Sequence, residues 1–263
     1  MIPKPIITRW QTMAPWKEFY QVEQDLVISR VLVEIFSDDF LRRHLAFRGG
    51  TALHKLYLHP APRYSEDIDL VQIKPGPISP IMKRLDQVID FFDQARSTQI
   101  KGHSAKAFYR FVSEYEGIPL RLKIEINTME HFHVLDWEHK TLRVDTEWFS
   151  GQADIRTYNI HELLATKLRA LYQRNKGRDL FDLDYARKHL NLDIDLILAC
   201  YSKYMKQSGN QVVPSRKIFL RNIESKIQDP LFTGDLEGLL RPEINYDINA
   251  AFSWLHEKII RKM

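Results

Sequence analysis

The sequence has few of the features that mark secreted or membrane-bound proteins. Its single cysteine is Cys200, which excludes an internal disulfide and removes any need for an oxidising compartment. No uninterrupted apolar run approaches the roughly 18 residues of a membrane-spanning helix. The first residues also lack the apolar stretch and small-residue cleavage site of a signal peptide. We therefore expect a soluble, cytoplasmic protein with no membrane partner.

Charge is almost balanced over the whole chain but is locally concentrated. Lysine and arginine number 38 against 34 acidic residues, which leaves a formal net charge of +4. This mild excess is compatible with a phosphate-rich partner but does not by itself indicate one. Basic residues cluster in two segments of the second half, at Arg169, Arg174, Lys176 and Arg178, and at Arg216, Lys217, Arg221 and Lys226. Nucleic-acid contact and an ordinary solvated surface both remain open.

The hydrophobic pattern changes character near residue 158. Before it, the pattern predicts helices at 15–36, 51–58 and 79–95 and strands at 45–47, 67–73, 107–115, 118–128, 141–147 and 154–158. After it, the pattern predicts only helices, at 159–174, 178–190, 193–207, 214–228 and 246–262. This order is typical of an α+β protein. We expect a mixed sheet with flanking helices over 1–158, followed by a helical domain over 159–263.

Two acidic residues stand one position apart on the strand predicted at 67–73. Side chains at i and i+2 of a strand point to the same face, so Asp67 and Asp69 should project together while Ile68 and Leu70 enter the core. Adjacent like charges are tolerated most easily around a cation, and Mg²⁺ favours a few carboxylates together with phosphate oxygens. A solvated strand edge with two exposed aspartates is the alternative for this pattern alone.

A pair of glycines lies upstream, between the short strand at 45–47 and the next predicted helix. Gly49 and Gly50 would let the backbone approach a phosphate closely, and the new helix offers free N–H groups to an anion. Thr51 adds a hydroxyl. The alternative is a tight turn with a glycine helix cap. A phosphate cradle followed by a same-face acid pair favours binding of a nucleoside triphosphate with a divalent metal.

These residues resemble a known family. The runs from Phe47 to Lys55 (FRGGTALHK) and from Arg63 to Leu70 (RYSEDIDL) are similar to the signature of the AbiEii/AbiGii-type nucleotidyltransferase toxins, which belong to the DNA polymerase β-like nucleotidyltransferase superfamily. A third block, from Lys167 to Leu183, resembles the family's helical motif of a lysine followed by Arg-Asp-x-x-Asp. The resemblance covers about residues 45–185 in three ordered blocks.

Further site residues follow from the strand pattern and from the resemblance. Alternation in the strand at 118–128 places Glu125 on a polar face, as a third carboxylate that assists the metal or accepts a proton; an ion pair with a basic neighbour is the alternative. The resemblance implies that Lys167 and Arg174, seven residues apart on one helical face, contact the triphosphate. It also implies that Asp179 or Asp182 closes the site. We favour Asp182, because Asp179 could cap the helix that begins there.

Two remaining groups of polar residues have less definite roles. Ser65 precedes Asp67 by two positions, so it should share its face and bind phosphate or orient an aspartate; filling a turn is the alternative. The histidines His131, His133 and His139 have no cysteine nearby and no defined frame for zinc. We expect a loop or surface role for them.

The resemblance implies an enzyme that is the toxin of a toxin–antitoxin pair. Such a protein would use Mg²⁺ or Mn²⁺ at Asp67 and Asp69 to transfer a nucleoside monophosphate from a nucleoside triphosphate to an acceptor hydroxyl, with tRNA as a candidate acceptor and a cognate antitoxin as partner. The alternatives are a basic module that only binds RNA or the antitoxin, and a metal-dependent phosphoesterase in which water replaces the acceptor.

Overall fold

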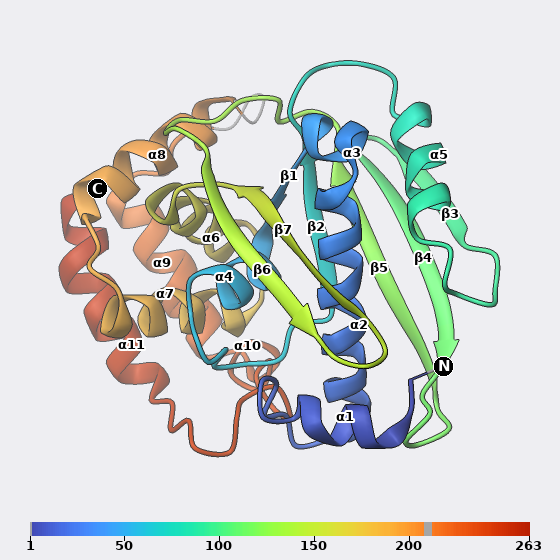
Figure 1. Ribbon diagram of the computed structural model, residues 1–263. Helices are drawn as coiled ribbons and strands as arrows, with labels where there is room; N and C mark the ends of the chain where they lie inside the picture. Colours follow the sequence, from blue (N-terminus) through green and yellow to red (C-terminus); the bar gives the residue numbers. More distant parts are fainter. Residues whose placement is uncertain (1, 208–211) are drawn as a thin grey trace. The chain divides into compact units, whose positions relative to one another are not determined.

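The computed structural model describes residues 2–207 and 212–263. The chain divides into two compact units, Met1–Tyr158 and Asn159–Met263, which we call the sheet unit and the helical unit. Figure 1 shows the elements of each. A mixed sheet in the first and helices in the second confirm the predicted α+β class. Within the described residues, no helix combines the length and apolarity needed to span a bilayer.

The sheet unit contains a seven-stranded mixed sheet in the order β3-β4-β5-β2-β1-β7-β6. Its strands are β1 (Leu45–Arg48), β2 (Asp67–Gln72), β3 (Ser97–Lys101), β4 (Ser104–Val112), β5 (Pro119–Asn127), β6 (Glu138–Asp145) and β7 (Ser150–Thr157). β2 runs parallel to β5 and β1 runs parallel to β7, whereas the other neighbours are antiparallel. The strands predicted at 107–115 and 118–128 correspond to β4 and β5, which pair as an antiparallel hairpin.

One face of this sheet is apolar and carries the core. On β2, Ile68 and Leu70 are buried; Leu70 pairs with Phe47 of β1, and Ile68 pairs with Ile124 of β5. Paired residues share a face, so the register carries the apolar side across the strands. Helix α2 (Phe19–Ser37), with most of its side chains buried, crosses this side (Figure 1). Asp67 and Asp69 therefore belong to the opposite, polar face.

The remaining helices of the sheet unit are α1 (Lys4–Trp10), α3 (Asp39–His44), α4 (Gly49–Leu56) and α5 (Ser79–Val88). Polar contacts tie two of them to α2: the Trp10 indole donates to Asp25 at 2.9 Å, and the Lys55 ammonium donates to Asp25 and to Ser29, each at 2.9 Å. The buried polar groups of α2 therefore serve as attachment points for α1 and α4.

Several predicted boundaries were wrong. Helix α2 begins at Phe19 instead of Pro15, because the chain first completes α1 and turns back over residues 11–18. Helix α5 ends at Val88 instead of 95, and Arg96 folds back to donate to the Met82 carbonyl at 2.9 Å. Neither α1 nor β3 was predicted. β3 is a largely exposed edge strand, so no apolar alternation marks it.

The helical unit is organised around α6 (Ile160–Gln173), which packs against α7 (Gly177–His189), α8 (Ile194–Gln207) and α9 (Arg216–Ile227). The shorter elements are α10 (Pro230–Thr233), α11 (Ile248–Trp254), a π-helical turn at Leu255–Ile259 and a 3₁₀ turn at Ile260–Lys262. The Asn159 side chain caps α6 by accepting from the His161 N–H at 3.0 Å. Glu162 is buried and accepts the Tyr204 hydroxyl of α8 at 2.7 Å.

Candidate active site

The acid pair stands at the first and third residues of β2. Asp67 lies opposite Lys123 of β5, and Asp69 lies between Glu125 of β5 and Arg48 of β1. Because paired residues share a face, three carboxylates and two cations lie on the polar side of three adjacent strands. Asp67 and Asp69 therefore share a face as expected, Glu125 lies on the same face, and the five charged side chains form a dense cluster.

The glycine turn lies directly against the acid pair. Gly49 begins α4 with φ of +84°, a left-handed conformation that favours glycine. A Cβ at this position would lie 2.9 Å from the Asp69 Cβ and closer still to its Oδ2. Glycine at position 49 is thus required twice, for backbone conformation and for space. The predicted proximity of turn and acids is a direct contact.

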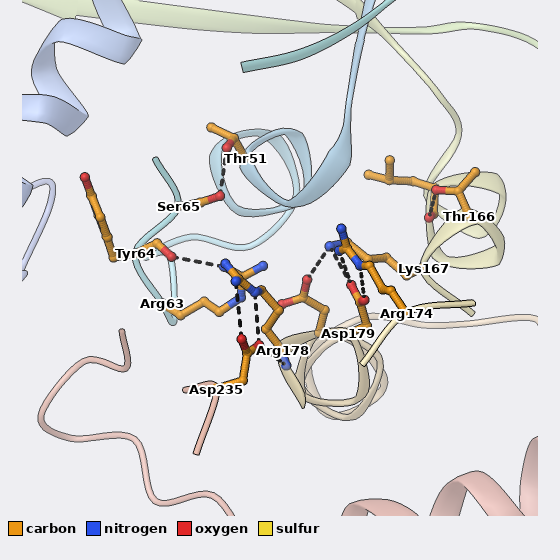
Figure 2. A network of polar contacts seen from close by, with 12 residues as sticks. Thr51, Arg63, Tyr64, Ser65, Thr166, Lys167, Arg174, Arg178, Asp179 and Asp235 are labelled. Atoms are coloured by element: carbon orange, nitrogen blue, oxygen red, sulfur yellow. Dashed lines mark hydrogen bonds and ion pairs between the residues drawn. The ribbon is translucent and has the colours of Figure 1, made fainter. Parts of the chain in front are cut away.

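The hydroxyls of Thr51 and Ser65 hold this turn together. The Thr51 hydroxyl lies 2.5 Å from the Asp67 carbonyl and 2.8 Å from the Ser65 hydroxyl; Figure 2 shows the second contact. A hydroxyl has one proton to donate. When Thr51 donates to the Asp67 carbonyl, Ser65 must donate to Thr51. Both side chains therefore position α4 against the start of β2, and Thr51 is almost fully buried.

Lys123 compensates the negative charge of the cluster. Its ammonium lies 2.8 Å from Asp67 Oδ2 and 3.3 Å from Glu125 Oε2, and Lys106 of β4 contacts the other Glu125 oxygen at 3.3 Å. The ion pair considered as an alternative for Glu125 is thus present. Glu125 also lies beside Asp69, its register partner on β2.

The three carboxyls differ in their protonation tendencies. Burial raises the pKa of Asp67, although Lys123 opposes the shift. Burial, reinforced by the charge of Asp67, raises the pKa of Asp69. Burial also disfavours the charged form of Glu125, but the Lys123 and Lys106 ammoniums outweigh it and lower the pKa of that carboxyl. Glu125 is therefore the carboxylate most firmly held in its charged form.

Metal binding by protein groups alone is not evident. Across residues 2–207 and 212–263, no three histidine, cysteine, aspartate or glutamate side chains converge closely enough to hold a metal ion. Asp67 and Asp69 supply hard oxygen donors on one face, the donor chemistry that Mg²⁺ takes when substrate phosphates complete its coordination. The histidines serve other contacts: Nδ1 of His131 and of His133 each lies 2.7 Å from a backbone carbonyl oxygen.

A second charged cluster is buried within the helical unit. The Lys167 ammonium of α6 lies 2.8 Å from Asp182 and 3.3 Å from Asp179, both fully buried residues of α7. Arg174 donates to both Asp179 oxygens, at 2.6 and 2.8 Å. Figure 2 shows Lys167 and Arg174 converging on Asp179. Arg174 stands just beyond the end of α6, as its C-cap with an extended backbone, so Asp179 brings it together with Lys167 and a shared helical face does not.

The structure changes the reading of α7. Asp179 makes no capping hydrogen bond, since α7 begins at Gly177 and Asp179 is turned toward Lys167 and Arg174. The helix-cap role allowed for it was wrong. Arg178, which could have formed an i,i+4 pair with Asp182, donates to Asp235 at 3.0 Å, as Figure 2 also shows. Asp182 keeps the shorter contact to Lys167.

Sequence reasoning missed two contributors to the cluster around the acid pair, Arg48 and Lys123, and the partner of Arg178, Asp235. Arg48 lies opposite Asp69 and pairs with Glu130 at 2.6 Å, although it stands within the glycine motif. Lys123 entered only as an unspecified basic neighbour. Asp235 had no local signal at all, because it lies 57 positions beyond Arg178.

Comparison with solved structures identifies the class of fold. MenT4, a nucleotidyltransferase toxin from Mycobacterium tuberculosis H37Rv, gives a TM-score of 0.61 at 16% identity, covering 100% of this chain and 91% of that one. A candidate nucleotidyltransferase from H. pylori gives a TM-score of 0.53 at 18% sequence identity, covering 93% of this chain and 98% of that one. JHP933 from Helicobacter pylori gives a TM-score of 0.51 at 16% sequence identity, covering 100% of this chain and 96% of that one. At these identities the similarity shows a nucleotidyltransferase fold.

The family is shown by the sequence itself. Residues 30–258 match the family described as nucleotidyl transferase AbiEii toxin of type IV toxin–antitoxin systems. The chain therefore belongs to the AbiEii family, and it is a nucleotidyltransferase of the toxin–antitoxin class. This confirms the resemblance found in the three sequence blocks. Comparison with curated protein sequences gave no match.

Substituting Gly49 with alanine tests the contact between turn and acid pair. The left-handed backbone should cost about 1–2 kcal/mol, and the collision with Asp69 about 1–3 kcal/mol more. Gly117→Ala is the matched control, because Gly117 has φ of +70° but no atom within 4 Å of an added Cβ. Urea unfolding should show a larger loss for Gly49→Ala. Equal losses would mean that Asp69 yields without strain.

The buried cluster of the helical unit predicts a large effect of Asp179→Asn. Removing one partner of a buried ion pair costs about 3–5 kcal/mol, because the Lys167 and Arg174 charges lose a shared counter-ion. Asp195→Asn serves as control, since Asp195 pairs with Lys262 on the exposed surface, where a pair is worth about 0–1 kcal/mol. Thermal and urea unfolding compare the two; similar small losses would contradict the assigned pairing.

Proposed function

We propose that this AbiEii-family chain transfers a nucleoside monophosphate from a nucleoside triphosphate to a hydroxyl of RNA, with tRNA as the acceptor. Asp67 and Asp69 would hold Mg²⁺ or Mn²⁺. The observation that carries the proposal is the contact of Gly49 with Asp69, which sets a helix N-terminus beside two same-face carboxylates. The proposed setting is the cytoplasm, with a cognate antitoxin as partner.

The chain's own contribution is to place phosphates and acids together. Gly49 and Gly50 open α4, whose first N–H groups are available to an anion. Asp67 and Asp69 supply oxygen donors beneath that turn. A metal bound there would neutralise the triphosphate and polarise the attacking hydroxyl. Thr51 and Ser65 fix the turn, so the site is organised before substrate arrives, as catalysis by positioning requires.

The proposed reaction exchanges one phosphorus–oxygen bond for another. The acceptor hydroxyl oxygen bonds to the α-phosphorus while the bond from that phosphorus to the departing pyrophosphate breaks, and the hydroxyl proton passes to a carboxylate or to solvent. Of the two roles considered for Glu125, charge support of the site fits better than proton acceptance. Contacts to Lys123 and Lys106 favour its ionised form, and a base held in this way accepts a proton poorly.

Lys167, Arg174 and Asp182 keep the roles that the motif suggests. We assign the Lys167 ammonium and the Arg174 guanidinium to the phosphates of the nucleotide, and Asp182 to positioning Lys167, which it contacts at 2.8 Å. Asp179 shares Lys167 and also engages both donors of Arg174. Because Lys167 is almost fully buried between two aspartates, the position of its ammonium group is fixed before a phosphate binds.

The proposed transfer is tested by incubating the purified chain with each α-labelled nucleoside triphosphate, Mg²⁺ and total RNA. Wild type should label RNA, with tRNA as the labelled species. The Asp67→Ala/Asp69→Ala protein should lose activity by at least about 100-fold, the size of effect that removing one preorganised charge contact produces. RNA binding unchanged by the double substitution, with no label transferred by wild type, would instead indicate a binding module.

Because the Lys123 ammonium pairs with Asp67 and Glu125, we expect it to compete with a metal ion for these carboxylates. In Lys123→Gln the carboxylates lose their ammonium partner, so Mg²⁺ should bind more tightly and raise the stability of the variant more than that of wild type. A tenfold gain in affinity corresponds to about 1.4 kcal/mol. Urea unfolding with and without MgCl₂ measures it.

The control for this competition is Lys106→Gln, which removes a lysine that contacts Glu125 alone among the three carboxyls. It should change the Mg²⁺ response much less. A response of Lys123→Gln equal to that of wild type would separate Lys123 from the metal site.

A further inference from the structure

A pocket of about 220 Å³ lies in the sheet unit between the end of α3 and strands β6 and β7. Its lining residues are Phe36, Arg42, Arg43, His139, Asp154 and Arg156. Arginines dominate this lining, and we call it the arginine pocket. None of these residues belongs to the three sequence blocks, and the proposed transfer chemistry uses none of them.

The arginines of this pocket are poorly compensated by acids. Arg42 pairs with Asp39 on the surface at 2.7 Å, but within residues 2–207 and 212–263 no carboxylate lies within ion-pair distance of Arg43 or Arg156. Asp154 lines the pocket, yet its Oδ1 accepts the Thr141 hydroxyl at 2.7 Å. Asp154 is therefore the one carboxylate among the lining residues, and it pairs with none of the three arginines.

Arg156 is held close to another cation. Its guanidinium donates to the Arg42 carbonyl at 2.8 Å, and burial together with the Arg42 charge lowers the pKa of Arg156. Like charges gathered in a concave site destabilise the protein unless an anion relieves them. Arginine also suits phosphate more than lysine does, because its planar fork can donate to two phosphate oxygens.

Strand register places the arginine pocket on the side of the sheet that carries the acid pair. Phe47 pairs with Thr157, so Arg156 lies level with Ala46 and shares the face of Arg48 and Asp69. Arg156 is two strands across and about two residues along from Asp69, a backbone separation of about 12 Å by strand geometry. A single RNA strand can span that distance.

A second pocket adjoins the first through Arg43. It has a volume of about 520 Å³ and combines Arg43, His44 and Lys74 with apolar groups such as Phe40 and Pro77. The Phe40 and His44 rings lie against each other, 4.2 Å between centroids. Cations beside aromatic and apolar surface are the combination that single-stranded nucleic acids use, phosphates on the cations and bases on the rings.

We propose that the arginine pocket binds a backbone phosphate of the RNA acceptor, with Arg42, Arg43 and Arg156 as its ligands. The choice of RNA rests on the proposed function. An acidic segment of a protein partner would need a row of carboxylate contacts, whereas this pocket is small, about 220 Å³, and three arginines line it. The geometry therefore fits a single phosphodiester, followed along the strand by contacts at the pocket that shares Arg43.

The test measures binding of a fluorescein-labelled single-stranded RNA to the full chain by anisotropy, over a series of salt concentrations and without nucleotide or Mg²⁺. In Arg43→Gln/Arg156→Gln, affinity should fall about tenfold or more. The slope of log K against log salt should become shallower by about 1.4, since each lost phosphate contact on a single strand contributes about 0.7. Arg43→Gln alone, at an exposed residue, should give about half that change.

Arg110→Gln is the matched control, because Arg110 is an exposed arginine of β4 that contacts Ser97. It should leave affinity and slope unchanged, and urea unfolding verifies that all variants fold. Affinity and slope equal to wild type in the single and double variants would overturn the proposal. So would competition by poly-glutamate as strong as that by unlabelled RNA, which would assign the pocket to an acidic protein. Release of the RNA by millimolar inorganic phosphate alone would overturn it too, as a free-phosphate site.

The same measurements separate this proposal from the proposed function. If RNA binding depends on the arginine pocket but the chain transfers no label, the pocket proposal is supported and the proposed transfer activity is refuted. If Arg43→Gln/Arg156→Gln binds RNA and transfers label as wild type does, the pocket proposal is refuted and the proposed transfer activity is supported.

Discussion

The structure of the site depends on the approach of one glycine to one aspartate. Gly49 has a left-handed backbone conformation and leaves no room for a Cβ beside Asp69. This contact joins the start of α4 to the polar face of β2, and the Thr51 hydroxyl reinforces it through the Asp67 carbonyl. A helix N-terminus and two carboxylates thus form one rigid corner of the sheet unit, where an anion and a cation can be bound together.

The two charged clusters are neutralised in different ways, and exposure decides the difference. The side chains of Lys123 and Asp67 are 23% and 34% exposed, so water screens this half-buried pair more than it screens a fully buried one. Lys167 is 6% exposed between two fully buried aspartates, a pair that is costly to break. The Lys123 pair is therefore easier to break than the Lys167 pairs, which fix that ammonium within the helical unit.

Local pattern was sufficient to predict the α+β class, the faces of β2 and β5 and most helices, because these follow from periodicities of two and 3.6 residues. Contacts between distant segments could not be predicted in the same way. Asp179 reads locally as a helix cap, and only packing of α7 on α6 shows it beside Lys167. The arginine pocket is formed by α3 together with β6 and β7, which lie more than 90 residues further along the sequence. No local sequence motif can therefore predict it. The edge strand β3 has no apolar face from which to predict it.

Locating the metal is the most direct test of the account. A crystal structure of the chain soaked with Mn²⁺ and a non-hydrolysable nucleoside triphosphate analogue would show the ion by anomalous scattering. The account predicts one Mn²⁺ about 2.1 Å from carboxylate oxygens of both Asp67 and Asp69, with triphosphate oxygens completing its shell below the Gly49 turn. Mn²⁺ bound to neither aspartate, or triphosphate bound away from that turn, would contradict it.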